Sequence, residues 1–83
     1  MNDTELEASL SQLKVYAHQW DLADAARQHA HSPQDYFLFK ATCDRLNRLY
    51  CALYDQLLEA GCRITWNGIE ARYEAVRSIR REL

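Results

Sequence analysis

Apolar residues recur over the first thirty positions at the spacing of an amphipathic helix. Their separations alternate between four and three, which places them on one helical face. The members of this stripe are Leu6, Leu10, Leu13, Ala17, Trp20, Ala23, Ala26 and Ala30. Asp3 or Thr4 can cap the start by accepting hydrogen bonds from free backbone N–H groups. We therefore expect a helix over about residues 4–30, with a break and restart at residues 21–24 as the alternative.

The stretch HAHSPQDYF, residues 29–37, predicts a corner. Ser32 can cap a new helix, Pro33 suits the first helical position, and Asp35 suits the third position of a capping box. His29 and His31 lie two positions apart and so point away from each other, and no Cys/His spacing of a zinc type is present. We favour a helix end, where histidine suits the dipole, over a metal site, and expect no cofactor.

The following segment has the strongest helical periodicity in the chain and predicts a helix over about residues 33–60. Gly61 can adopt the left-handed conformation that ends a helix, and Cys62 beyond it can pack against Leu57. The stripe supplies the residues that we assign to the core or to a dimer seam: Phe39, Cys43, Leu46, Tyr50, Leu53 and Leu57.

Two helices of similar length joined by a short corner are expected to pack as an antiparallel hairpin. Pairing outward from the corner places Trp20 near Leu46. Beyond Gly61, Asn67 and Glu70 resemble a helix cap, and a further stripe follows at helical spacing. Its members are Trp66, Ile69, Tyr73, Val76, Ile79 and Leu83. The expected fold is therefore all-α, with a third helix over about residues 67–83 in a single domain of residues 1–83.

The second helix carries more apolar surface than one partner helix can cover. Residues 36–39 are apolar around the whole circumference, and residues 49–54 nearly so, which favours burial on two faces. The third helix or a second copy of the hairpin can supply the cover. We expect a homodimer, because the combined apolar surface is large for 83 residues.

Charge and cysteine content indicate the cellular compartment in which the protein is expected. The net charge is only −2, with an acidic first third and a basic end. Three cysteines cannot all pair within one chain, no signal segment opens the sequence, and no apolar run approaches the roughly 18 residues of a membrane span. We expect a reduced, cytoplasmic protein that does not contact a membrane.

Motifs for catalysis are missing from the sequence: there is no glycine-rich phosphate loop, nucleophile elbow or paired-cysteine motif. A nucleophile pair of His18 and Cys43 is disfavoured, because Cys43 falls on the buried stripe. We expect no enzyme. Nucleic-acid binding is also disfavoured, because the acidic first helix repels phosphate, although the expected third helix carries two short basic rows. These rows contain Arg72, Arg77, Arg80 and Arg81.

The first 26 residues resemble a known group of proteins. The matching residues are Thr4-Glu5-Leu6, Leu10, Leu13-Lys14, Trp20-Asp21-Leu22 and Ala26. This pattern is similar to the first helix of small helical host-takeover proteins from temperate phages that infect through type IV pili. In that group a quorum-sensing anti-activator binds a LuxR-type transcription regulator, and a twitching-inhibitory protein binds the ATPase that powers pilus assembly. Both are non-enzymatic, and their fold is a helical hairpin that dimerises.

The resemblance implies that this protein binds and inhibits a host protein in the host cytoplasm. The pilus-assembly ATPase is the first expected target, with a block of twitching and superinfection as the consequence, and a LuxR-type regulator is the second. A helical co-chaperone of a secretion system and a small nucleic-acid-binding regulator are the alternatives. The candidate partner contacts are Glu5, Glu7, Tyr16, Trp20, Asp21, Asp24 and Tyr36.

Overall fold

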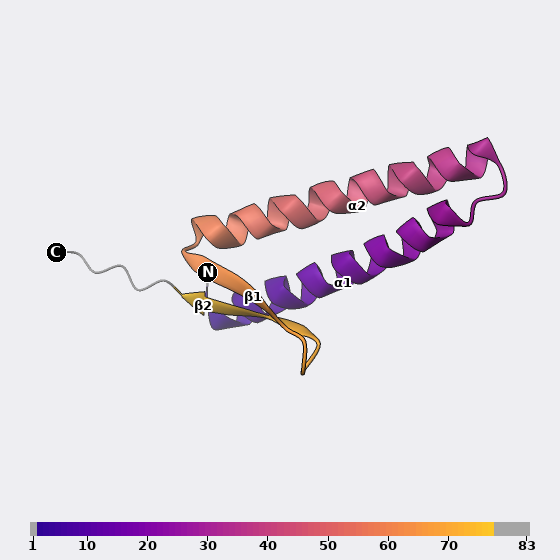
Figure 1. Ribbon diagram of the computed structural model, residues 1–83. Helices are drawn as coiled ribbons and strands as arrows, with labels where there is room; N and C mark the ends of the chain where they lie inside the picture. The colour runs from indigo at the N-terminus through magenta and orange to yellow at the C-terminus, as the bar shows by residue number, and fades with distance from the viewer. Residues whose placement is uncertain (1, 78–83) are drawn as a thin grey trace.

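The computed structural model, which describes residues 2–77, contains two long antiparallel helices followed by a two-stranded antiparallel β-hairpin (Figure 1). The elements are α1 (Asp3–Gln28), α2 (Pro33–Glu59), β1 (Cys62–Asn67) and β2 (Arg72–Arg77). The expected helical hairpin is confirmed. The all-α class and the third helix over residues 67–83 are wrong, because residues 62–67 and 72–77 pair as strands. Residues 78–83, the rest of that expected helix, lie outside the described part of the chain.

Side-chain caps set the starts of both helices. Asn2, rather than Asp3 or Thr4, caps α1, since its Oδ1 accepts a hydrogen bond from the Glu5 N–H at 2.8 Å. At the corner, Ser32 Oγ accepts from the Asp35 N–H at 3.1 Å and Pro33 occupies the first turn of α2, as predicted. Helix α1 runs without a break through residues 21–24 and ends at Gln28.

Gly61 turns the chain from α2 into the first strand. Its φ of +82° lies in the left-handed region, where a side chain is disfavoured, and its N–H donates to the Leu58 carbonyl oxygen at 2.9 Å. The predicted helix stop at Gly61 is confirmed. The chain leaves this stop as a strand, so Cys62 enters the core as the first residue of β1.

The expected third helix fails at Asn67. Asn67 Oδ1 accepts hydrogen bonds from the Ile69 N–H at 3.0 Å and the Glu70 N–H at 3.1 Å, as the cap of a helix would. The chain instead reverses after this single turn, with Ala71 at a φ of +52°, and Asn67 Nδ2 donates to Glu74 Oε1 at 2.7 Å across the strands. The same side chain therefore closes a β-turn.

Strand pairing divides the apolar stripe that suggested a helix. Trp66 pairs with Tyr73 across the two strands, and their ring centroids lie 4.9 Å apart. Ile69 lies in the turn and is 98% exposed, whereas Val76 in β2 is 63% exposed. Successive strand residues point to opposite faces, so Tyr73 and Val76 cannot share one. The apolar residues of this segment, although spaced three and four positions apart, therefore do not share one buried surface.

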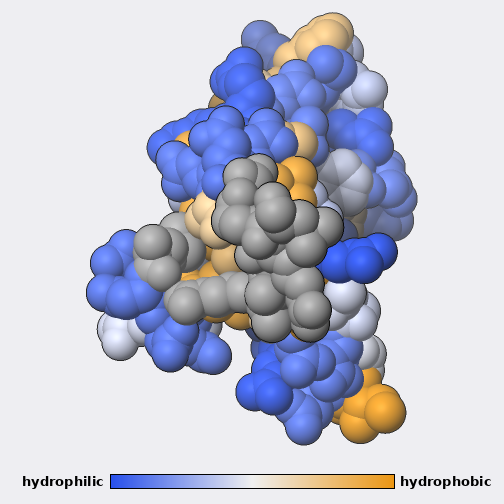
Figure 2. Space-filling view, turned by 90° about the vertical axis from the view of Figure 1, so that its left-hand side faces the viewer, coloured by the Kyte–Doolittle hydropathy of each residue, from blue (hydrophilic) through white to orange (hydrophobic). Residues whose placement is uncertain are grey.

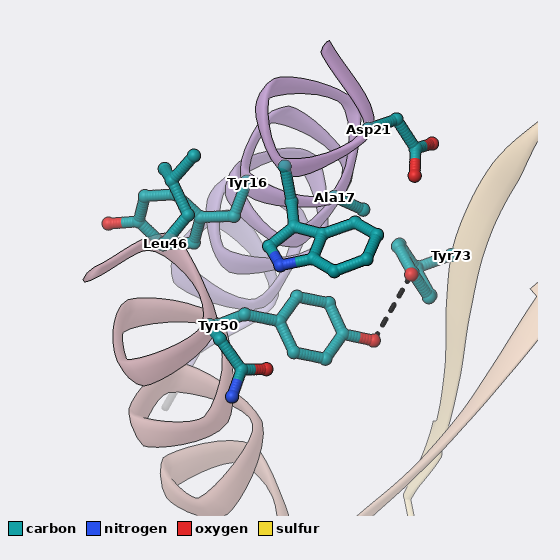
Figure 3. A pocket seen from close by; sticks show the side chains of 8 residues that line it. Tyr16, Ala17, Asp21, Leu46, Tyr50 and Tyr73 are labelled. Carbon is teal, nitrogen blue, oxygen red and sulfur yellow. Dashed lines mark hydrogen bonds between the residues drawn. The ribbon is translucent and has the colours of Figure 1, made fainter. Parts of the chain in front are cut away.

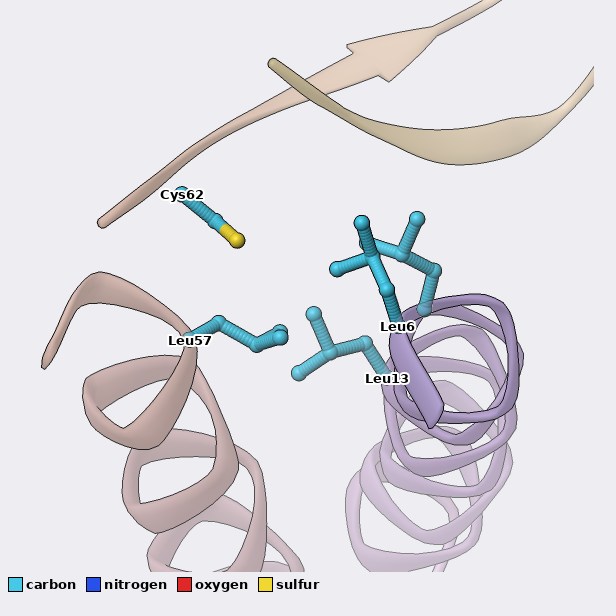
Figure 4. Packing of buried hydrophobic residues seen from close by; sticks show 5 residues of the cluster. Leu6, Leu13, Leu57 and Cys62 are labelled. Atoms are coloured by element: carbon cyan, nitrogen blue, oxygen red, sulfur yellow. The ribbon is translucent and has the colours of Figure 1, made fainter. Parts of the chain in front are cut away.

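The hydrophobic core lies at the end of the hairpin where α1 begins and α2 ends. Leu13 and Leu57 are fully buried, and Figure 4 shows them converging with Leu6 and Cys62 beneath the strands. Strand β1 packs on α2 and strand β2 on α1. The residues packed around this cluster are Leu10, which is buried, and Tyr50, Leu53, Tyr54, Ile64, Tyr73 and Ala75, which are partly buried. The β-hairpin thus covers the helix pair at this end.

Replacement of Leu13 or Leu57 by alanine tests the position of this core. Each substitution removes a fully buried side chain, and we expect each to lower the free energy of unfolding by about 2–5 kcal/mol, measured by urea denaturation. The matched control is Leu22→Ala on α1, where the side chain is 59% exposed and the change should stay within about 0.5 kcal/mol. Equal effects at all three positions would contradict this assignment of the core.

Candidate functional site

A small pocket opens where both helices meet strand β2 (Figure 3). Its volume is about 180 Å³. It is lined by Tyr16, Ala17, Trp20, Asp21, Leu46, Asn47, Tyr50 and Tyr73. We call it the aromatic pocket, because four of these eight side chains are aromatic.

Helical spacing builds two walls of the aromatic pocket. Tyr16 and Trp20 lie one turn apart on α1, and Leu46 and Tyr50 lie one turn apart on α2, so each pair shares a helical face. Trp20 and Leu46 line the same pocket, as the predicted register of the hairpin requires. The third wall is Tyr73, which comes from β2.

The two tyrosines at the base of the pocket are hydrogen-bonded. The Tyr50 hydroxyl donates to the Tyr73 hydroxyl at 3.1 Å, and the ring centroids lie 6.2 Å apart (Figure 3). Burial, and after it this hydrogen bond, raises the pKa of Tyr50 well above the ordinary value for tyrosine. Tyr50 is therefore a neutral phenol at physiological pH, and its hydroxyl holds β2 to α2.

Two aspartates on α1 have different surroundings. Asp24 Oδ1 accepts a hydrogen bond from Arg27 Nη2 at 2.6 Å, and Asp24 Oδ2 accepts from Gln28 Nε2 at 2.9 Å. The bond to Asp24 is the main reason why the pKa of Arg27 is raised. Asp21 lies at the edge of the aromatic pocket, and within residues 2–77 its carboxylate makes no hydrogen bond or ion pair. Among residues 2–77, Asp21 is thus the carboxylate of this pocket that has no partner.

The predicted partner contacts fall into three groups along the helical hairpin. Tyr16, Trp20 and Asp21 come together in the aromatic pocket. Glu5 and Glu7 are exposed near the start of α1. The other two, Asp24 and Tyr36, lie near the helical corner and both contact Arg27. Trp20 and Asp24 also line a further pocket together, so these two groups adjoin, whereas Glu5 and Glu7 lie closer to the start of α1.

Two residues of the site were not predicted as contacts. Tyr50 was assigned to the core or dimer seam, and Tyr73 to the third helix. The signal for Tyr73 was the β-branched and aromatic content of residues 62–67 and 72–77, which favours strands. Of the six residues assigned to the core or seam, Cys43 and Leu57 are buried, and the remaining four are half-buried: Phe39, Leu46, Tyr50 and Leu53. All three cysteines are free thiols, and Cys51 is exposed.

The basic rows of the expected third helix do not form as predicted. Arg72 lies in β2, where its Nη2 is 2.7 Å from Glu70 Oε2 and 3.8 Å from Glu74 Oε2. Arg77 is the last residue of β2, and residues 80–81 lie outside the described part of the chain. Among residues 2–77, no three His, Cys, Asp or Glu side chains are grouped so as to hold a metal ion.

Neither α1 nor α2 is long and apolar enough to cross a membrane. Comparisons with protein-family models, curated proteins and solved structures find no significant match to this chain. The fold defines the protein as a helical hairpin extended by a β-hairpin.

The raised pKa of Tyr50 predicts a loss of stability at alkaline pH. Above about pH 10 an unfolded tyrosine releases its proton while folded Tyr50 keeps it. The unfolded state then binds fewer protons than the native state, so the free energy of unfolding falls as pH rises. We expect Tyr50→Phe to reduce this slope above pH 10, and Tyr73→Phe, which removes only the hydrogen bond, to reduce it less. Urea titrations at several pH values measure the slopes, and an unchanged slope in Tyr50→Phe would contradict the assignment.

Proposed function

We propose that this protein binds another protein and inhibits it by covering a surface which that protein needs, without catalysing a reaction. The observation that carries the proposal is the number of large apolar side chains left exposed on the two helices. They are Val15, Trp20, Leu22, Tyr36, Phe37, Leu38, Leu49 and Leu58. Contiguous exposed apolar side chains are characteristic of protein interaction sites, and aromatic residues are enriched among those that dominate binding energy.

Seven of these eight residues lie between positions 14 and 56, where the hairpin has little core of its own, and the exception is Leu58. Within the described part of the chain, Cys43 is the only buried hydrophobic residue between positions 14 and 56. At the start of α2, Phe37 is 65% and Leu38 63% exposed. The strand end differs: in Figure 2 most of the coloured surface there is hydrophilic, with smaller hydrophobic areas between. We therefore place the main contact surface on the helices near the corner.

The target is proposed from the resemblance of the first 26 residues to the phage host-takeover inhibitors. We propose the pilus-assembly ATPase of a bacterial host as the first target and a LuxR-type quorum-sensing regulator as the second. Both targets would be met in the host cytoplasm. Inhibition of the ATPase would stop pilus formation and twitching, and so prevent superinfection by phages that need the pilus.

A homodimer is also part of the proposal. A groove of about 350 Å³ runs between α1 and α2 and is lined by helix residues alone, with no strand residue over it. Small residues are among those that line it, including Ala8, Ser9 and Ala52, beside Leu49, which is 38% exposed. Small side chains let another helix approach closely, so a second copy can pack its own groove here in a symmetric contact.

Binding to purified targets tests the proposed function. We expect the protein to bind the ATPase or the regulator in biolayer interferometry, and its expression in a piliated bacterium to abolish twitching zones. The double substitution Phe37→Ser with Leu38→Ser should weaken binding at least tenfold, because two exposed apolar anchors are lost. The matched control is Ile69→Ser in the turn after β1, where an equally apolar side chain is 98% exposed. Absence of binding to both targets, or equal weakening by the control, would contradict the proposal.

Sedimentation velocity tests the homodimer. We expect the wild-type protein to sediment as a dimer at micromolar concentration. Leu49→Asp should convert it to a monomer, because a charge is then buried without a partner in the groove. Leu22→Asp, at an exposed position on α1 outside that groove, is the control and should stay dimeric. A monomeric wild-type protein would refute the dimer while leaving target binding open to its own test.

A further inference from the structure

We infer that the aromatic pocket binds the guanidinium group of an arginine side chain presented by a partner protein. This inference deepens the proposed function, on which its biological role rests. It adds the chemical group that the partner must offer and the residues that receive it. Three features of the pocket carry the inference: its aromatic walls, an unpaired carboxylate at its edge, and a similar arrangement that the chain already forms one turn further along α1.

The walls of the pocket suit a flat cation. Tyr16 and Trp20 from α1, Tyr50 from α2 and Tyr73 from β2 all line it. The faces of aromatic rings attract cations, and a planar guanidinium can stack on them as well. At about 180 Å³ the pocket is smaller than the roughly 300–1,000 Å³ typical of small-molecule sites. It therefore fits the end of one side chain better than a free ligand.

The edge of the pocket carries a negative charge that no side chain among residues 2–77 neutralises. Asp21 is exposed there, and the α1 residues three or four positions away from it are Ala17, His18, Asp24 and Ala25. None of these is a lysine or an arginine. Lys14 lies two turns earlier and lines a neighbouring pocket together with His18 and Asp21 itself, but within residues 2–77 it forms no ion pair with Asp21. Arg27 and Lys40, which line the pocket on the other side of Trp20, are engaged by Asp24 and Asp44.

The next turn of α1 already holds an arginine in the way that we infer. The guanidinium of Arg27 bonds Asp24 at 2.6 Å and lies 5.7 Å from the centroid of the Tyr36 ring. An aspartate, a guanidinium and an aromatic ring thus come together near the corner. At Asp21 the aspartate and the rings are present, but no cation among residues 2–77 is paired with them, and the partner's arginine would supply it.

Arginine is favoured over lysine because of its geometry. A guanidinium can donate two parallel hydrogen bonds to one carboxylate while its flat face remains on a ring, whereas an ammonium group acts as a compact, strongly hydrated charge. The pocket offers both kinds of partner, a carboxylate at the edge and rings on the walls. A basic side chain without the planar group would use only part of this arrangement.

Titration of the isolated protein with amino-acid amides tests the inference. N-acetyl-arginine amide is added while the indole N–H signals of Trp20 and Trp66 are followed by NMR, with Trp66→Phe used for assignment. We expect a saturable shift of the Trp20 signal. N-acetyl-citrulline amide, which has a similar shape without the charge, should leave that signal unchanged, and N-acetyl-lysine amide should bind more weakly than the arginine amide.

Two matched substitutions locate the binding group. Asp21→Asn should weaken arginine amide binding about threefold to tenfold, because it removes the charge and keeps the shape. Asp55→Asn, which removes the same charge from an exposed position on α2, should leave binding unchanged. Both positions are exposed, so neither variant is expected to unfold the protein.

Each other outcome overturns the inference. Equal shifts with the citrulline amide would show an uncharged apolar pocket, and equal affinity for the lysine amide would exclude an arginine site. Equal weakening by Asp21→Asn and Asp55→Asn would show only a general attraction to acidic protein. Because no target protein is present, failure here with intact target binding would refute this inference alone. Arginine binding without binding of the ATPase or the regulator would refute only the proposed targets.

Discussion

The rest of the structure depends on the contact of Leu13 and Leu57 beneath Cys62. Isolated helices are only marginally stable in water, so packing must fix how α1 and α2 lie against each other. Because Cys62 is the first residue of β1, the same contact also fixes where the β-hairpin lies. Tyr73 on the paired strand reaches the aromatic pocket as a consequence. The core and the candidate site are therefore linked through one short turn at Gly61.

Burial is distributed unevenly along the helical hairpin, and this unevenness is what suggests a partner. The strands cover the end that holds Leu6, Leu10 and Leu13, whereas no strand of the described residues 2–77 packs near the corner, where Phe37 and Leu38 are exposed. Large apolar side chains that stay in water do not stabilise a monomer. Their transfer out of water is the main favourable contribution to the free energy of association. The corner end of the helical hairpin therefore keeps Phe37 and Leu38 exposed without strand cover, whereas the exposed apolar residues at the other end lie on the β-hairpin itself, at Trp66, Ile69 and Val76.

The helices could be predicted from the sequence because their signals are local and agree with one another. Periodicity, Ser32 with Pro33 at the corner, and Gly61 at the stop all point to the same two elements. The third helix could not be rejected in this way, because Asn67 makes the same short-range hydrogen bonds in a turn as in a cap. Short apolar segments are also ambiguous in period, so Trp66 and Tyr73 fit a helical stripe as well as a cross-strand pair. Strand pairing, which is not local, decides between them.

The candidate site, like the fold, could be predicted from the sequence only where its residues lie on one element. Tyr16, Trp20 and Asp21 could be chosen from the sequence because one helix presents them together, but Tyr73 joins them only through the β-hairpin. The unpaired state of Asp21 follows from helical geometry. With 3.6 residues per turn, Arg27 lies three positions after Asp24 and faces it, yet lies six positions after Asp21, about 240° around the axis. The helix that brings a cation to Asp24 therefore cannot bring the same cation to Asp21.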